Sequence, residues 1–157
     1  MARRIDFYDD PNAPTPNSLV PSVNVVVANE AGDILLIRRS DNDNWAVPGG
    51  AVDLGESIPV AAVRETLEET GITCEITGIV GTYTDPRHVI LYTSNGEVRQ
   101  EFSIVLTARA VGGKPTPSDE SREVRWIPKA EIEHYRMDRS MQVRIGHYML
   151  GSSPYIG

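Results

Sequence analysis

The chain has 157 residues, 40% of them hydrophobic and 24% charged, and its 22 acidic and 15 basic side chains give a formal net charge of −7. This length and composition indicate one globular domain and exclude a disordered polypeptide. The longest apolar runs are too short to cross a bilayer. A single cysteine excludes an intramolecular disulfide, and no secretory signal opens the sequence, so we expect a cytoplasmic protein. The acidic charge disfavours membrane association and a stable nucleic-acid complex.

Taken along the chain, the sequence predicts a mixed β-sheet covered by helices. Clustered prolines predict an extended N-terminal arm over residues 1–18, ahead of a domain over residues 19–157. β-Branched runs and turn residues predict strands at Val23–Val27, Asp33–Arg38, Cys74–Tyr83, Val89–Thr93, Val98–Ala110 and Glu123–Ile127. We expect the first two strands to be buried on both faces. Apolar periodicity and stop signals predict helices at Ser57–Thr70, Lys129–Tyr135 and Asp138–Leu150.

The helix predicted over Ser57–Thr70 has an apolar side and an acidic side, because successive residues are rotated by about 100°. The apolar side, which we expect to pack on the sheet, carries Val60, Val63 and Leu67. The opposite side carries three carboxylates, with small residues one turn earlier that leave room above them: Glu65, Glu68, Glu69, Ala61 and Ala62.

Three glutamates at positions i, i+3 and i+4 repel one another unless something bridges them. Clustered carboxylates with open space suit a hard divalent cation, which prefers oxygen ligands and recruits substrate phosphates. The chemistry that follows is metal-assisted hydrolysis of a phosphoryl or diphosphate group. For the three glutamates alone, a solvent-exposed acidic helix face is an equally good interpretation.

The residues around this helix favour the metal site. Seven identities recur at fixed spacing: Gly50, Glu56, Arg64, Glu65, Glu68, Glu69 and Gly71. At a background of roughly 7% per position, a chance match is on the order of 10⁻⁸. The pattern resembles the Nudix box, GX5EX7REUXEEXGU, in which U is apolar, and Thr66 is the one departure from it. The chain is therefore similar to Nudix (MutT-like) hydrolases, which implies an α/β fold of the α+β type: an αβα sandwich with a mixed sheet between helices.

The resemblance also implies roles for individual residues. Catalytic roles fall to Arg64, Glu65, Glu68, Glu69 and Glu120, and Mg²⁺ or Mn²⁺ ligands to Gly49 through its carbonyl, Glu56, Glu65, Glu68, Glu69 and Glu120. We expect Glu56 and Arg64 to orient the other ligands. Glu120 fits the position of a carboxylate that family members add before a Trp-containing strand, with Asp119 and Glu123 as rivals. The general base is Glu65 or Glu120, and the sequence does not decide between them.

Residues outside the box are candidates for substrate binding. Arg39 is expected near a phosphate, although an exposed arginine at a strand end is an equally good interpretation. Tyr83 and Arg87 lie around a loop after the box, where they are placed to meet a base or a phosphate. Phe102 is a further candidate, although core packing is the favoured interpretation of its residue type. His88 is interpreted as an ordinary loop residue.

We therefore expect Mg²⁺-dependent hydrolysis of a nucleoside diphosphate linked to another moiety, of the ADP-ribose, nucleotide-sugar or dinucleotide type. One alternative is a house-cleaning nucleoside triphosphate pyrophosphatase of the MutT type. A second is a non-catalytic domain that senses a nucleotide. The expected partner is a small nucleotide substrate, and a homodimer is plausible by analogy with the family.

Overall fold

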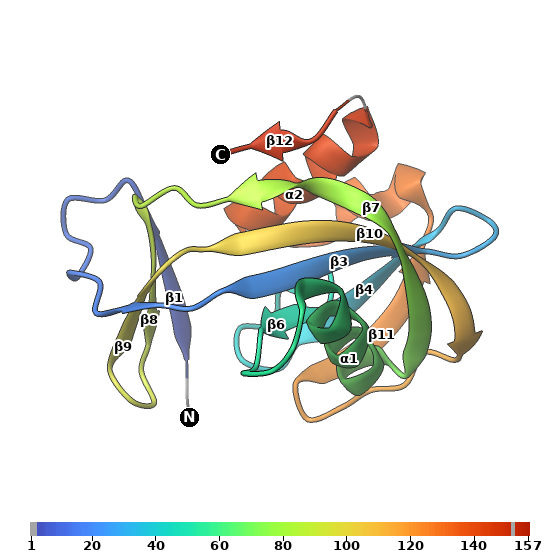
Figure 1. The fold of residues 1–157 in the computed structure, drawn as a ribbon, viewed down its shortest axis with the longest axis horizontal. Helices are drawn as coiled ribbons and strands as arrows, with labels where there is room; N and C mark the ends of the chain where they lie inside the picture. Colours follow the sequence, from blue (N-terminus) through green and yellow to red (C-terminus); the bar gives the residue numbers. More distant parts are fainter. Residues whose placement is uncertain (1–2, 152) are drawn as a thin grey trace.

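An eight-stranded mixed sheet forms the centre of the fold in the computed structural model, which describes residues 3–151 and 153–157 (Figure 1). Its main strands, in spatial order, are β11 (Ser121–Ile127), β4 (Ile34–Arg39), β3 (Ser22–Ala28), β10 (Ser103–Gly113), β7 (Ile72–Tyr83) and β12 (Tyr155–Ile156). Two short strands, β5 (Trp45–Ala46) and β6 (Gly49–Ala51), pair with β4 and β3. Strand β10 runs parallel to β3 and antiparallel to β7, so the predicted mixed sheet is confirmed.

Helices cover both faces of this sheet. Helix α1 (Ile58–Thr70) packs on one face, and α2 (Arg139–Leu150) packs on the other face with the 3₁₀ helix η1 (Lys129–His134). Along β3, Val25 belongs to the core under α1 and Val26 to the core under α2. The strand is therefore buried on both faces, as its β-branched run predicts, and the αβα sandwich is confirmed. In the described part of the chain, no helix is long and apolar enough for a membrane span.

A second, four-stranded sheet lies at one end of the molecule (Figure 1). Its order is β1 (Arg4–Tyr8), β8 (His88–Tyr92), β9 (Glu97–Gln100) and β2 (Ser18–Leu19). Residues 4–8 were predicted to belong to an extended arm, but they form strand β1. Residues 9–17 connect β1 to β2 without helix or strand. The pairing of β1 with β8 places Tyr8 opposite His88. Local propensity and periodicity cannot predict a contact between residues so far apart in the sequence.

The long strand predicted over Val98–Ala110 is divided into β9 and β10 at Glu101 and Phe102. Here the chain leaves the small sheet and enters the large one. The buried Glu101 carboxylate accepts hydrogen bonds from the Phe102 N–H and the Ser103 hydroxyl, both at 2.8 Å. The strand is interrupted where this carboxylate is buried, and donors on the next two residues satisfy its need for hydrogen bonds.

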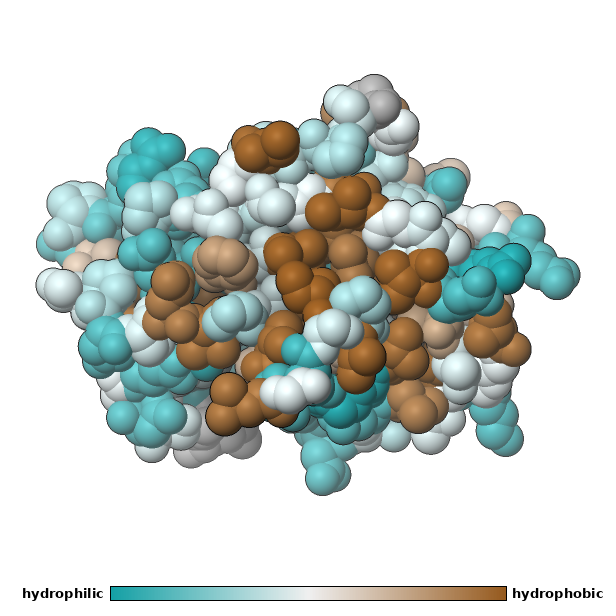
Figure 2. Space-filling view, viewed as in Figure 1, coloured by the Kyte–Doolittle hydropathy of each residue, from teal (hydrophilic) through white to brown (hydrophobic). Residues whose placement is uncertain are grey.

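Helix α1 faces the sheet differently from the prediction. Val60 and Leu67 are about half exposed, whereas Ala61, Ala62 and Thr66 are fully buried. The expectation that Val60, Val63 and Leu67 dock the helix is therefore wrong for Val60 and Leu67, and Val63 is only partly buried. Small side chains let the helix approach the sheet closely, and the larger apolar ones are more exposed. Figure 2 shows apolar side chains spread over the face of the molecule that carries α1.

Candidate active site

The chain enters α1 through a pair of glycines on β6, which pairs with β3. The Ser57 side chain caps the helix by accepting from the Val60 N–H at 3.3 Å, and Gly71 ends it in the left-handed conformation (φ 75°). A Cβ on Gly50 would lie 2.5 Å from the nearer Glu65 carboxylate oxygen, and one on Gly49 would lie 2.1 Å from a β3 carbonyl oxygen. Glycines at these positions therefore hold the helix carboxylates directly against the strand.

Arg64 joins the loop to the helix. Its guanidinium donates to both Glu56 carboxylate oxygens, at 2.6 and 2.8 Å, and to the Ala51 carbonyl oxygen at 3.1 Å. Its Nη1 also contacts Glu65 at 2.9 Å and Glu68 at 3.2 Å. The hydrogen bonds from Arg64 lower the pKa of Glu56 to about 2. Both Glu56 oxygens are occupied in this bidentate pair, which is the arrangement of an orienting group.

Glu65 and Glu69 share a site with more negative charge than their surroundings compensate. Burial, and then the charge of Glu65, raise the pKa of Glu69, although the Gly49 N–H donates to it at 3.2 Å. Burial also raises the pKa of Glu65, despite its hydrogen bond from Arg64. One buried and one partly buried carboxylate at the same place favour either protonation or a bound cation.

Glu120 faces the same place from the loop before β11. With Glu69 and Arg39 it lines a space of about 270 Å³, which we call the glutamate cavity. The negative charge of Glu120 contributes to the raised pKa of Glu69. Of the two rivals, Glu123 pairs with Arg38 at 2.9 Å on the outer side of the strand, and Asp119 contributes its carbonyl oxygen to a hydrogen bond from Ser40.

Arg39 is the cation in the wall of the glutamate cavity, and its charge opposes the raised pKa of Glu69. Its guanidinium is held by Asp41 through hydrogen bonds of 2.9 and 2.6 Å. Arg39 does end β4, but its side chain is only 28% exposed. The interpretation of Arg39 as an exposed strand-end arginine therefore does not describe its surroundings.

The donor set fits a hard divalent cation by its chemistry. Carboxylates at Glu65, Glu69 and Glu120, and the backbone of Gly49, are the oxygen ligands that Mg²⁺ and Mn²⁺ prefer. Within residues 3–151 and 153–157, no three acidic, cysteine or histidine side chains converge closely enough to enclose an ion. Arg64 holds Glu65 and Glu68 instead, so a cation would compete with this guanidinium for their oxygens.

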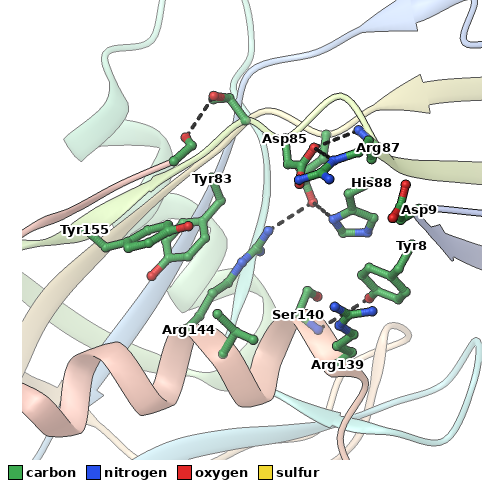
Figure 3. A pocket seen from close by; sticks show the side chains of 14 residues that line it. Tyr8, Asp9, Tyr83, Asp85, Arg87, His88, Arg139, Ser140, Arg144 and Tyr155 are labelled. Atoms are coloured by element: carbon green, nitrogen blue, oxygen red, sulfur yellow. Dashed lines mark hydrogen bonds and ion pairs between the residues drawn. The ribbon is translucent and has the colours of Figure 1, made fainter.

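Tyr83 and Arg87 lie away from the glutamates. Both line a second space of about 280 Å³, the aromatic cavity, which also has Tyr8, His88 and Tyr155 in its walls (Figure 3). The Tyr83 hydroxyl contacts His147 Nδ1 at 2.7 Å, and Arg87 is exposed and paired with Asp85 at 3.0 Å. His88 is not a loop residue: it is the first residue of β8 and is buried. Phe102 is half-buried and lines neither cavity.

A buried pair of charged residues between these regions was not predicted from the sequence. Glu101 and Arg144, 4% and 3% exposed, form an ion pair of 3.1 Å, and Arg144 also donates to the Asn24 side chain. Together they line a third space of about 230 Å³, the Gly49 cavity, which contains Gly49, Arg39 and Glu120 in its walls. The position of Arg144 on the same helix face as Met141 and Ile145 was the available signal, because a charge on a buried stripe needs a partner.

Comparison with known proteins gives the family. The NUDIX domain family model matches residues 18–145. The chain belongs to the Nudix family. This Nudix protein is 33% identical to a MutT-like protein of Streptomyces ambofaciens over 86% of its own length and 80% of the relative's. It is also 33% identical to an ADP-ribose pyrophosphatase of Methanocaldococcus jannaschii, over 66% and 62% of the two chains.

Other relatives carry different names, and solved structures share the fold. A putative 8-oxo-dGTP diphosphatase of Bacillus subtilis is 49% identical to the Nudix protein over 40% of this chain and 42% of that one. A Nudix hydrolase structure from Nitrosomonas europaea matches with a TM-score of 0.71 and 23% identity, over 90% of this chain and 78% of the other. At that identity the structural match shows the fold alone.

Proposed function

We propose that this Nudix hydrolase, an enzyme that acts on phosphorus-containing anhydrides, uses Mg²⁺ to cleave the diphosphate linkage of a nucleoside diphosphate joined to another moiety. The observation that carries the proposal is the uncompensated pair Glu65 and Glu69, packed against a glycine loop with Glu120 across the cavity. A site with this surplus of carboxylates gains most from a divalent cation and from the phosphates that the cation attracts.

Each residue of the box has a distinct role in the proposal. Glu65, Glu69 and Glu120, with the Gly49 carbonyl, would hold Mg²⁺, and Glu68 would add a ligand in place of its contact with Arg64. When bound, the cation would supply positive charge to the diphosphate and to the charge that develops in the transition state. Arg64 fixes Glu56 and the entry loop through its bidentate pair. Glu65 or Glu120 takes the proton of the attacking water: Glu120 lines the Gly49 cavity and the glutamate cavity, and Glu65 lies against Gly50 in the wall of the Gly49 cavity.

Arg39 supplies the positive charge for the substrate. Its guanidinium borders both the glutamate cavity and the Gly49 cavity, and Asp41 holds it in place. We assign it to a phosphate of the diphosphate group. Planar guanidinium groups bind phosphate oxygens through paired hydrogen bonds, which fixes the orientation of the group as well as its position.

A second candidate function is the house-cleaning hydrolysis of non-standard nucleoside triphosphates. It is favoured by the name of the Bacillus subtilis relative, which is 49% identical over the 63 matched residues. The name of the Methanocaldococcus jannaschii relative, which covers more of this chain, favours the ADP-ribose type instead. Of these two matches, the one to the Methanocaldococcus jannaschii relative spans more of this chain, 66% against 40%, so we place the diphosphate-linked nucleosides first.

Phosphate release tests the proposal. The purified protein is incubated with Mg²⁺ and a panel of ADP-ribose, nucleotide sugars, dinucleotides, nucleoside triphosphates and 8-oxo-dGTP. We expect turnover of at least one diphosphate-linked nucleoside, and a loss of about 10²-fold or more in Glu69→Gln, as for removal of one stabilising group from a transition state. Glu75→Gln is the matched control, because Glu75 is exposed on β7 and paired with Arg109. Absence of turnover on every substrate, or full activity in Glu69→Gln, would refute it.

A further inference from the structure

The aromatic cavity has two stacked walls that face each other across Arg144 (Figure 3). On one side, the Tyr8 ring stacks on His88 with centroids 4.5 Å apart. On the other side, the Tyr83 ring stacks on Tyr155 at 5.2 Å. Such paired walls are suited to a flat ring, because aromatic faces bind planar groups by stacking at little cost in conformational entropy.

Segments outside the family match build much of this cavity. The family model covers residues 18–145, whereas Tyr8 belongs to β1 and Tyr155 to β12. Both strands are held in place by pairing: β1 runs along β8, and β12 runs along β7 at Gly81. Two of the aromatic residues in the wall of the cavity therefore lie outside the residues that the family model matches.

The aromatic cavity lies next to the spaces near the box glutamates, because neighbouring cavities share wall residues. Glu101 and Arg144 line both the aromatic cavity and the Gly49 cavity, and Arg39 and Glu120 line both the Gly49 cavity and the glutamate cavity. Each space, at about 230 to 280 Å³, is below the ~300–1,000 Å³ typical of ligand sites. A ligand that occupied more than one of them would therefore pass along the buried Glu101–Arg144 pair.

Arg144 is the residue at the junction, and its pairing is incomplete. Its guanidinium lies over the Tyr83 ring, 4.9 Å from the centroid, and is paired with Glu101 and Asn24. Its Nε–H is buried and has no hydrogen-bond partner. Buried donors are nearly always paired, so an orphan donor in the wall between two cavities indicates an acceptor that belongs to a ligand.

We propose that the aromatic cavity binds the nucleobase of the substrate, and that Arg144 is a specificity-determining residue at the boundary between the base and the phosphates. The inference rests on the proposed function for the chemistry at the diphosphate. The occupant is a base because stacking walls alternate with polar groups at the rim, Arg139 and Asp9, which supply a donor and an acceptor for a ring edge. A hydrocarbon chain would leave these groups unpaired.

Two variants alter the cavity without touching the glutamates, and each has a control on the same element. Val143→Trp fills the cavity from α2, and Leu150→Trp places the same ring on α2 at an exposed residue outside it. Tyr155→Ala removes one wall, and Ile156→Ala alters the exposed neighbour on β12. Because Val143 and Tyr155 are 43% and 41% exposed, both test variants are expected to fold.

Calorimetric titration measures binding of AMP, GMP, CMP and UMP, and of inorganic phosphate, all with Mg²⁺. We expect at least one nucleotide to bind both test variants about tenfold more weakly than the wild type, as for loss of a base–aromatic stack. Inorganic phosphate binding stays within twofold, and both controls match the wild type. Nucleotide affinity equal to the wild type in both test variants would overturn the inference. Because binding is measured, a wild type that binds nucleotides through this cavity yet hydrolyses none refutes the proposed function alone.

Discussion

Substitutions at two adjacent glycines, Gly49 and Gly50, are expected to affect stability and activity differently. A Cβ on Gly49 would lie 2.1 Å from the Val23 carbonyl oxygen and 2.9 Å from the Asn24 Cα, both fixed atoms of β3. A Cβ on Gly50 would instead lie 2.5 Å from a carboxylate oxygen of Glu65, at the far end of a flexible side chain. Gly49→Ala must displace a strand, whereas Gly50→Ala needs only to displace a catalytic carboxylate.

The expected magnitudes differ accordingly. Overpacking against backbone costs about 3 kcal/mol or more in Gly49→Ala, which lowers Tm by roughly 6–12 °C in a domain of this size. In Gly50→Ala the stability loss is about 1 kcal/mol, the value of the hydrogen bond between Arg64 and Glu65 that must break. Its activity falls by about 10²-fold, because a misplacement of about 1 Å costs that much.

Thermal unfolding and steady-state hydrolysis of the best panel substrate test this pair. Gly146→Ala is the control, since nothing lies within 4 Å of an added Cβ there and alanine favours the helix by up to about 1 kcal/mol. Full activity in Gly50→Ala would refute the placement of Glu65 against the loop. An unchanged Tm in Gly49→Ala would refute the close packing of β6 on β3.

Four further variants test the packing and the buried charges. Ala61→Val is expected to cost about 1–3 kcal/mol in chemical denaturation because Ala61 is fully buried between α1 and the sheet, whereas Leu67→Ala costs less than about 1 kcal/mol because its side chain is half exposed; the reverse order would contradict the observed face of the helix. Thr66→Val is expected to keep both stability, within about 1 kcal/mol, and activity, because the buried Thr66 hydroxyl donates to the Ala62 carbonyl oxygen of its own helix; a loss of turnover would assign it a role in the site. Burial opposes ionisation of Asp6, but hydrogen bonds from His88 and Arg4 lower its pKa overall, so its contribution to stability is present at neutral pH and is lost as the pH falls below about 4. Asp6→Asn should therefore cost about 3 kcal/mol at pH 7 and give a shallower decline in unfolding free energy between pH 5 and pH 2; an equally steep decline would refute the assignment.

The residues of the box could be identified from the sequence because their relationships are local. Ser57 and Gly71 bound the helix through contacts within one turn, and both caps are observed. The spacing of Glu65, Glu68 and Glu69 requires only helical geometry to bring the carboxylates together. The resemblance implied that Arg64 orients the other ligands, and its guanidinium hydrogen-bonds the carboxylates of Glu56, Glu65 and Glu68.

Other features were beyond local patterns. Hydropathy favoured Val60 and Leu67 as the buried side of α1, but the close approach of the helix to the sheet selects small residues instead. The short strand β1 carries no strong signal of its own, and its partner β8 supplies the edge that defines it. Tyr83 was expected to meet a base or a phosphate, and its position at the end of β7 places it in the aromatic cavity, away from the glutamate cavity.

By itself the sequence determined the Nudix family, the order of the main strands and helices, and the glutamates that suit a metal ion, because each depends on neighbours along the chain. Only the tertiary structure decided which distant residues lie around those glutamates. Glu101 and Arg144 are 43 residues apart in the sequence. They meet because α2 packs on the face of the sheet to which β10 contributes. Contacts between distant segments depend on how whole elements pack, and no spacing in the sequence encodes them.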